Sequence, residues 1–270
     1  MKTGKLLIVG MGSSPDLVTV RGARAIAGAD LCVVGRQGDL EAWGEYIDGK
    51  PVIFTPHMAR VFYGTSTSSL PDDSQRTVAD ENEALRRDFV EKLRNEIEAG
   101  KTVAYLQWGD PMLYGNLWPL EMLPPGTPVE IVPGVGAFQS ASAALGRCTV
   151  YGWDTNSVII TTEDWPGRAD PNEKLMQAGT SMVFFNMRSS YPSLFEQLAA
   201  AYPADTPVAV VSHAGDAEKQ AVVRSTVERF LEEVDWQGLS PNRHLLFVGK
   251  FLETGQFRKD GVFYGRGSKF

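Results

Sequence analysis

The feature of this chain that most restricts its fold is a long amphipathic stretch, residues 75–99, followed directly by an apolar run. Apolar residues recur every four positions along the stretch, and charged residues occupy most of the others, which is the pattern of a helix with one buried face. The apolar face comprises Leu85, Phe89, Leu93 and Ile97, and Val90 widens it. Gly100 is a suitable C-cap, and "TVAYLQW" at 102–108 has the composition of a buried strand. We therefore expect the helix to pack against a sheet, as in an α/β protein.

The rest of the N-terminal half repeats this alternation of strand and helix. Short apolar runs at 5–10, 31–35 and 51–54 have the length of buried strands, and residues 17–29 form an amphipathic stretch between the first two. A strand, a helix and a second strand in this order predict a parallel sheet with right-handed crossovers. Residues 55–74 fit neither pattern, and a loop of this length is usually functional or mobile.

A candidate domain boundary lies at residues 123–130, "LPPGTPVE", which contain three prolines and one glycine. Apolar runs and helical stretches continue after it. Further strands are expected at 157–162, 181–187, 207–213 and 244–251, with helices at 191–201 and 226–234. We therefore predict two α/β lobes, residues 1–124 and 125–270.

Composition excludes several classes of protein. Of the 270 residues 43% are hydrophobic and 22% charged, which is ordinary for a globular chain. The net charge of −7, without a dense Lys/Arg run, argues against a nucleic-acid partner. The first apolar run, "LLIVGMG", is too short to span a membrane and lacks a signal-peptide cleavage pattern. Cys32 and Cys148 lie in or beside apolar stretches, which predicts buried free thiols in a cytoplasmic protein.

The glycine-rich turn after the first strand, "GMGSSP", does not predict a dinucleotide site. The third glycine of the G-x-G-x-x-G fingerprint is Pro15, which prevents close packing of the following helix. The acid about twenty residues further on, Asp30, precedes the second strand, whereas a ribose-binding acid should end it. Gly10 and Gly12 indicate that the backbone passes close to a ligand or to another segment.

The histidines and cysteines do not predict a metal site or a covalent nucleophile. His57, His213 and His244 have no second histidine or cysteine at metal-ligand spacing, so no metal is expected. The chain lacks G-x-S-x-G, and neither thiol has a neighbouring base, so no catalytic residue is assigned. His213 and His244 border apolar strands, where a structural role is the usual one. His57, in the long loop, is a candidate substrate contact.

Two strand ends carry residues suited to binding. "GDP" at 109–111 follows the expected strand at 102–108, and ligands of α/β proteins bind at the carboxyl ends of strands. A plain surface turn is the alternative for these three residues. Arg188 directly follows the run at 181–187 and is a candidate anion-binding residue.

Four segments together resemble a known family. They are "IVGMGSSPDLVTVRGARAIAGADLCVVG" (8–35), "VAYLQWGDPMLYG" (103–115), "VEIVPGVGAFQSASAALG" (129–146) and "PVAVVSHAGDAEKQAVVRSTV" (207–227). In this order they are similar to the S-adenosylmethionine-dependent tetrapyrrole methylases, which methylate ring carbons in sirohaem and cobalamin biosynthesis. The resemblance implies two α/β lobes with the methyl donor in a cleft between them, a small-molecule tetrapyrrole acceptor and a homodimer.

The resemblance also implies which residues bind S-adenosylmethionine. The matching positions are Trp108, Gly109, Asp110, Leu113, Gly136, Ala137, Met187 and Ala214. Gly109 would let the main chain approach the donor, and Asp110 would present an anion to the sulfonium. At an effective dielectric constant of about 20 this attraction is worth only a few kcal/mol.

Two departures from the family concern the acceptor. The family's first loop reads G-x-G-P-G-D-P, whereas Ser13 stands here in place of the donor-contacting proline, which implies that this loop serves the substrate. Members that methylate uroporphyrinogen carry an acid after the second strand, where this chain has Gly35 followed by Arg36. This favours the corrin-pathway branch over the sirohaem branch.

Local cations are needed to bind a polycarboxylate to a chain of net charge −7. The candidate cations are Arg36, His57, Arg60 and Arg188, since they end strands or lie in the long loop. Ser13 is the uncharged member of the expected substrate-binding residues. Arginine suits this task because its planar fork pairs with a carboxylate through two hydrogen bonds. The alternative is that Arg36 and Arg188 are solvent-exposed or paired with local acids.

Several acceptors remain open. The "WGDP" spelling and the long charged helix before it resemble precorrin-6A synthase (deacetylating), whereas the C-terminal half resembles the C11 or C17 methylases. A methylase of the same fold with a non-tetrapyrrole acceptor, and a non-catalytic binder of tetrapyrrole or nucleoside, are the other two hypotheses.

Overall fold

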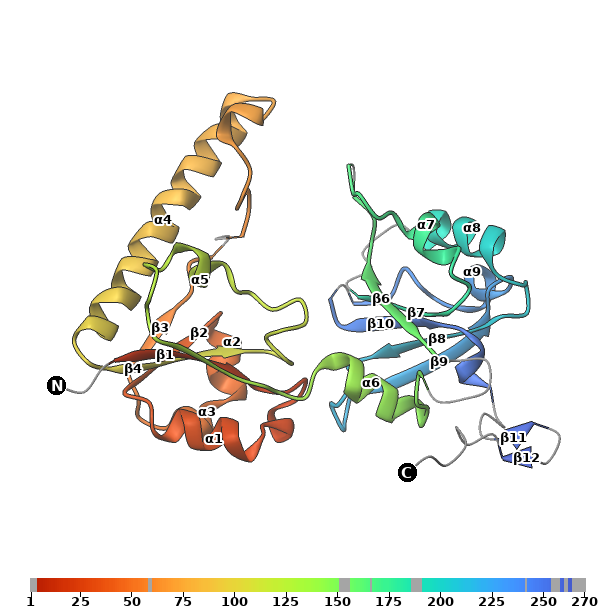
Figure 1. Cartoon of the computed structure of the whole chain (residues 1–270), viewed down its shortest axis with the longest axis horizontal. Coiled ribbons are helices and arrows are strands. Elements are labelled where there is room, and N and C mark those ends of the chain that lie inside the picture. The colour runs from red at the N-terminus through yellow and green to blue at the C-terminus, as the bar shows by residue number, and fades with distance from the viewer. Residues whose placement is uncertain are drawn as a thin grey trace. The chain divides into compact units, whose positions relative to one another are not determined.

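A computed structural model describes residues 4–57, 60–150, 156–165, 167–185, 191–240 and 242–253, together with the backbone of 258–259 and 262–263. The chain divides into two compact units, Met1–Gly136 and Ala137–Phe270. In Figure 1 the first unit runs from red to yellow-green and the second from green to blue.

The first unit is built on a five-stranded parallel sheet, as the alternation of strand and helix predicts. Its strands are β1 (Lys5–Gly10), β2 (Leu31–Val34), β3 (Val52–Phe54), β4 (Thr102–Gln107) and β5 (Val129–Val132). They lie in the order β3-β2-β4-β1-β5, and every neighbouring pair is parallel. The central strands β1 and β4 are buried along almost their whole length, which explains their continuous apolar sequence.

Helices cover both faces of this sheet. They are α1 (Val20–Ala27), α2 (Gln37–Ala42), α3 (Gly44–Ile47), α4 (Asp73–Glu98) and α5 (Trp118–Met122), with 3-10 turns at Pro15–Leu17 and Thr67–Ser69. Figure 1 shows α4 and α5 on one face and α1 and α3 on the other. Alternate strand residues supply the two cores: Ile8 and Tyr105 pack with α4, and Val9 and Leu106 pack with the α1–α3 side.

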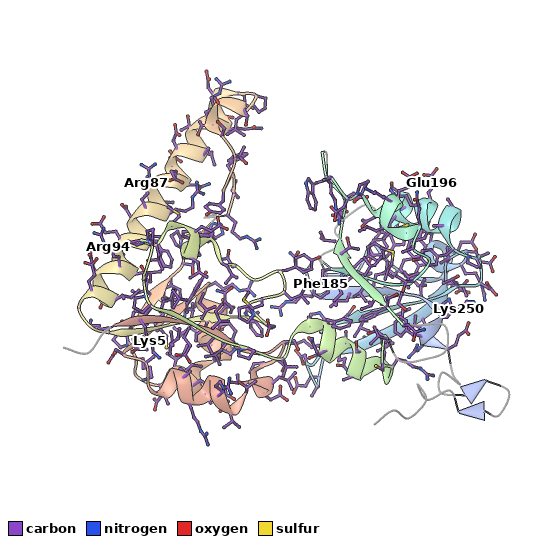
Figure 2. The ribbon with its side chains drawn as sticks, viewed as in Figure 1. Lys5, Arg87, Arg94, Phe185, Glu196 and Lys250 are labelled. Carbon is purple, nitrogen blue, oxygen red and sulfur yellow. The ribbon has the colours of Figure 1, made fainter. Side chains whose placement is uncertain are left out.

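The buried face of α4 differs from the predicted stripe in its N-terminal half. Leu85 is 45% exposed, whereas Asn82 and Arg86 are buried. The cause is that the loop before α4, and not the sheet, covers this half. The Nη1 of Arg86 donates to the carbonyl of Val61, and its guanidinium lies 5.4 Å from the centre of the Tyr63 ring. In Figure 2 Arg87 and Arg94 lie on the outer side of α4.

The loop at residues 55–74, which the sequence predicts to be mobile, has firm attachments in its described part. The Nε and Nη2 of Arg76 donate to the carbonyl of Leu70 at 3.2 and 2.9 Å. Tyr63 donates to the Glu121 carboxylate at 2.5 Å, and desolvation together with this bond raises the pKa of Tyr63 to about 12. The part of the loop from Arg60 onward is therefore held against α4 and α5.

The second unit contains a mixed sheet. Its strands are β6 (Val158–Thr162), β7 (Ser181–Phe185), β8 (Pro207–Ser212), β9 (Ala221–Thr226) and β10 (His244–Val248), in the order β6-β7-β10-β8-β9. The β6–β7 pair is parallel, and the other pairs are antiparallel. Its remaining elements are α6 (Ala137–Leu145), α7 (Asn172–Met176), α8 (Tyr191–Ala201), α9 (Phe230–Glu233), the 3-10 turn Lys250–Leu252, β11 (Arg258–Lys259) and β12 (Val262–Phe263).

Strand β9 is absent from the sequence prediction. It is an edge strand whose first four residues are exposed, so it lacks the apolar run that identifies a buried strand. The helix expected at 226–234 is shorter and spans Phe230–Glu233.

The two units divide after Gly136, not at 124/125 as the sequence analysis placed the boundary. The reason is that β5 pairs with β1 from Leu6↔Val129 to Val9↔Val132 and completes the first sheet. The proline-rich stretch is thus the loop between α5 and β5. Loop and linker share the same composition, so the sequence does not separate them.

The two thiols differ in their surroundings. Cys32 is buried in β2, and desolvation raises its pKa to about 11. Cys148 is exposed, contrary to the expectation that both are buried.

No helix in the described ranges combines the length and the apolar character that crossing a membrane requires.

Candidate functional site

Three loops of the first unit meet where β1, β4 and β5 end. Gly12, after β1, and Gly109, after β4, form an antiparallel bridge: the Gly109 N–H donates to the Gly12 carbonyl at 2.8 Å, and the Gly12 N–H donates back at 3.3 Å. Both residues have a positive φ, +80° and +70°, which L side chains rarely adopt. The bridge therefore requires glycine at both positions.

Gly10 and Gly134 bring the same loops into direct backbone contact. A Cβ on Gly10 would lie 2.4 Å from the Gly134 nitrogen, and a Cβ on Gly134 would lie 2.2 Å from the Gly109 carbonyl oxygen. We call Gly10, Gly12, Gly109 and Gly134 the glycine crossing. These four glycines have a structural reason to be present that is independent of any ligand, in addition to the approach of the methyl donor that the family resemblance implies for Gly109.

Asp110 connects two of the loops through both of its carboxylate oxygens. Oδ1 accepts from the Met112 N–H at 2.8 Å, and Oδ2 accepts from the Gly134 N–H at 3.1 Å. The side chain is half-buried. A carboxylate has about four acceptor positions, so two remain to face a cation.

The turn after Asp110 is tight and strained. A Cβ on Gly115 would lie 1.9 Å from the Pro111 carbonyl oxygen, and Tyr114 has φ +58°. The Leu113 N–H donates to the Asp110 carbonyl at 3.3 Å. This bond holds Leu113, an expected contact of the methyl donor, beside the Asp110 carboxylate. Backbone strain of this kind is often found at ligand-binding sites.

Trp108 and Arg36 meet at one buried carboxylate. The Asp39 Oδ1 accepts from the Trp108 indole N–H at 2.8 Å and from the Arg36 Nε at 3.2 Å. The Trp108 ring also packs on the buried Trp43, with ring centres 4.6 Å apart. Arg36 is thus paired with a local acid, the alternative considered in the sequence analysis, although its side chain is 65% exposed. Sequence reasoning did not identify Asp39, and its signal is an acid three residues after Arg36.

The other residues of the first unit that are expected to bind the methyl acceptor lie on loops that follow the carboxyl ends of the strands. Ser13 directly follows the glycine crossing and is half-buried. His57 and Arg60 are exposed in the loop after β3. Burial raises the pKa of Tyr105 in β4, and hydrogen bonds with Thr55, Gln107 and Asn116, together with the charge of Arg60, counter this rise.

The remaining expected donor contacts are less fully described. Gly136 is buried, Ala137 begins α6, and Ala214 is buried after β8. Ala214 follows His213, which has φ +49° and donates its N–H to the Arg243 carbonyl at 2.7 Å. Met187 and Arg188 lie outside the described residues.

His244 belongs to the core of the second unit. Its Nδ1 lies 3.0 Å from the Ser240 carbonyl, to which it donates, so its Nε2 accepts from the Tyr191 hydroxyl at 2.7 Å. Desolvation lowers the pKa of His244 and raises that of Tyr191. Over the described part of the chain no three His, Cys, Asp or Glu side chains gather as a metal site would require.

Comparison with known proteins identifies relatives along most of the chain. A family model described as Tetrapyrrole (Corrin/Porphyrin) Methylases matches residues 5–231. The cobalt-precorrin-4 C(11)-methyltransferase of Methanocaldococcus jannaschii is 27% identical over 256 residues, which cover 92% of this chain and 88% of that protein. The precorrin-4 C(11)-methyltransferase of Rhodococcus erythropolis is 28% identical over 258 residues, which cover 92% of each.

Solved structures share the fold. A cobalt-precorrin-4 methyltransferase matches with a TM-score of 0.73 at 23% identity, over 92% of this chain and 96% of the other. A uroporphyrin-III C-methyl transferase from Thermus thermophilus, solved with S-adenosylhomocysteine, matches with a TM-score of 0.65 at 19% identity, over 92% and 99%.

The family's methyl donor, S-adenosylmethionine, fits the residues at this edge of the sheet. The donor carries a positive sulfonium, and Asp110 supplies a half-buried negative charge with unused acceptor positions. The glycine crossing places residues that lack side chains at three strand ends, so that main chain can line a ligand there.

Proposed function

We propose, from the premise that this chain belongs to the tetrapyrrole (corrin/porphyrin) methylases, that it methylates carbon C11 of a precorrin-4-type ring with S-adenosylmethionine as donor. The observation that supports this choice of acceptor is the similarity of this chain to two C11 methyltransferases, over nearly the whole length of this chain and of each relative. It favours C11 over the precorrin-6A synthase (deacetylating) interpretation, which depended on the short "WGDP" spelling and the helix before it. Gly35 in place of an acid argues further against uroporphyrinogen.

On the donor side we assign binding to Trp108, Gly109, Asp110, Leu113, Gly136, Ala137, Met187 and Ala214. Asp110 is the charged member of this set and attracts the sulfonium by a few kcal/mol at an effective dielectric constant of about 20. The sulfonium loses its charge as the methyl group leaves. Asp110 therefore contributes to donor affinity more than to the rate of the chemical step.

On the acceptor side we assign binding to Ser13, Arg36, His57, Arg60 and Arg188. Arg36 and Arg60 carry permanent positive charges on the loops that follow the neighbouring strands β2 and β3, where they can pair with the ring's carboxylates. The ring carbon attacks the methyl carbon while the C–S bond breaks and its electron pair returns to sulfur, and the ring then releases one proton, so that it gains one methylene overall. The protein's part in this step is alignment of the two reactants.

A direct assay tests the proposal. The purified chain is incubated with S-adenosylmethionine and, separately, with precorrin-4, its cobalt form and uroporphyrinogen III. We expect S-adenosylhomocysteine and a ring heavier by one methylene, methylated at C11, from a precorrin-4 form. Methyl transfer with release of acetate would instead support precorrin-6A synthase, and binding of a ring without S-adenosylhomocysteine would support a non-catalytic binder.

We further propose that the chain acts as a homodimer, as its family resemblance implies. Analytical ultracentrifugation at micromolar protein should give twice the chain mass of 29.6 kDa, and a single species of 29.6 kDa would contradict it.

A further inference from the structure

We propose that Asp39 is a positioning residue which holds the acceptor-side Arg36 and the donor-side Trp108 in one fixed arrangement. This inference rests on the proposed function for the roles of Arg36 and Trp108. Its structural basis is the single oxygen, Asp39 Oδ1, that accepts from both the Trp108 indole at 2.8 Å and the Arg36 Nε at 3.2 Å.

The location of Asp39 explains how it reaches both residues. Arg36 follows β2 and Trp108 follows β4, and these strands are parallel neighbours whose carboxyl ends lie side by side. Asp39 is in α2, which begins directly after Arg36, and it is 5% exposed. A Cβ on Gly35 would lie 2.8 Å from its Oδ2, so glycine at position 35 leaves the space that the carboxylate occupies.

The pairing orients Arg36 without using up its guanidinium. Asp39 takes the Nε, and among the described residues no acceptor reaches Nη1 or Nη2. The side chain is 65% exposed, so these two nitrogens can form a bidentate pair with a carboxylate of the acceptor. An arginine held at Nε binds such a group with less loss of side-chain freedom than a free one.

Both the indole nitrogen and the ring face of Trp108 have partners in the first unit. Its indole N–H is fixed by Asp39, and its ring packs on the buried Trp43 with a 44° angle between planes. The next residues along the chain are Gly109 and Asp110, the centre of the assigned donor site. A shift of Trp108 would therefore move the start of the donor loop.

A purely structural role for Asp39 makes a different prediction. A buried carboxylate that only supports the fold would change stability when replaced, and any effect on the donor and on the acceptor would be alike. A positioning role separates the two, because an asparagine keeps an oxygen for the Trp108 N–H but removes the charge that pairs with Arg36. Alanine removes both interactions.

The experiment compares Asp39→Asn, Asp39→Ala and, as matched control, Glu41→Gln, an exposed acid on the same helix. Acceptor KM and kcat come from steady-state methylation, and the Kd of S-adenosylhomocysteine comes from calorimetry. We expect Asp39→Asn to raise the acceptor KM about tenfold with kcat and Kd nearly unchanged, and Asp39→Ala to raise both KM and Kd. Adding Arg36→Gln to Asp39→Asn should raise KM no further.

An acceptor KM that stays at the wild-type value in folded Asp39→Asn would overturn the proposal. So would equal effects of Asn and Ala on KM and on Kd. One readout does not depend on the proposed function: the indole N–H signal of Trp108, assigned in NMR spectra with Trp108→Phe, should move in Asp39→Ala but not in Glu41→Gln. If the wild-type chain binds no S-adenosylhomocysteine and this signal still moves, the proposed function fails while the Asp39 contact stands.

Discussion

Two arginines on loops that follow strands, one in each unit, are used in opposite ways. Arg36, after β2 of the first unit, is held at one nitrogen and is mostly exposed. Arg168, after β6 of the second unit, is 7% exposed at its side chain and donates through all three of its nitrogens. Its acceptors are Asp164, Asp170, Asn172, Thr161 and the Thr162 carbonyl.

The difference shows which cation can bind a ligand. An arginine whose donors are all satisfied within its own loop stabilises that loop and has little left to offer. An arginine held only at Nε is both oriented and available. In the first unit the loops at the glycine crossing contact one another through main chain, and the Asp110 carboxylate also connects two of them.

The largest expected effect tests the statement that the loops of the first unit pack directly through their main chain. Gly134→Ala places a Cβ 2.2 Å from the Gly109 carbonyl oxygen, a contact that main chain cannot relieve without moving. We expect the free energy of unfolding to fall by more than about 4 kcal/mol, measured by urea denaturation. Gly44→Ala is the control, because a Cβ there meets nothing within 4 Å. A Gly134 variant as stable as this control would contradict direct packing of the loops.

The second prediction concerns the satisfied arginine. Arg168→Ala leaves the partly buried Asp164 and the buried Asn172 without their cation, which should cost about 3–5 kcal/mol of unfolding free energy. Arg229→Ala, which breaks an exposed pair with Glu233 in the same unit, should cost less than about 1 kcal/mol. Equal losses of unfolding free energy in Arg168→Ala and Arg229→Ala, measured by thermal and urea unfolding, would contradict a stabilising role specific to Arg168.

The third prediction concerns the available arginine. Arg36→Ala should raise the acceptor KM about tenfold, equivalent to about 1.4 kcal/mol, with an unchanged Kd for S-adenosylhomocysteine. Its effect on unfolding should be smaller than that of Arg168→Ala, because the Arg36 side chain is 65% exposed and the buried Asp39 keeps its bond from the Trp108 indole. Arg87→Ala, an exposed arginine on α4 of the same unit (Figure 2), should leave the acceptor KM as it is. Wild-type acceptor kinetics in Arg36→Ala would place the acceptor elsewhere.

The smallest expected effect comes from His244, a buried histidine whose two ring nitrogens are both hydrogen-bonded in the core of the second unit. Burial keeps His244 neutral and lowers its pKa, so the unfolded chain binds more protons than the folded one below the unfolded value near 6.5. Stability is therefore intact above that pH and falls as the pH drops toward the folded pKa, by at most about 1.4 kcal/mol per pH unit. Unfolding curves between pH 7.5 and 5.5 should show this loss in the wild type, and His244→Gln should flatten it. An equal slope in both would exclude His244 as its source.

Much of the fold follows from sequence because most strands are buried on both sides. Apolar runs identify β1, β4, β7, β8 and β10, and the spacing from 75 to 99 identifies α4. Exposed β9 has no such run and is missed. Leu85 is misplaced because periodicity defines a helix face but not what covers it, and here Arg86 contacts Val61 and Tyr63.

The candidate site is less predictable, for a physical reason. The Arg36–Asp39 pair is local and could have been read from an i, i+3 spacing. The bond from Asp39 to Trp108 joins residues 69 positions apart, and only the adjacency of β2 and β4 creates it. The resemblance names Gly109 as a ligand contact, but its bridge to Gly12 is a tertiary fact that no local pattern shows.

The glycine crossing has a consequence for how such enzymes diversify. Gly10 ends β1, Gly109 and Gly134 lie in the loops after β4 and β5, and the backbones of these residues fill the space that a side chain on Gly10 or Gly134 would require. A mutation in one loop is therefore tolerated only with compensating changes in the other two, which makes this corner resistant to evolutionary drift. Among the described residues of the loops after β2 and β3, which contain Arg36, His57 and Arg60, no glycine lies this close to the backbone of another loop. With the acceptor and donor sites proposed above, a new ring specificity can be selected in these loops one substitution at a time, while the donor corner stays constant.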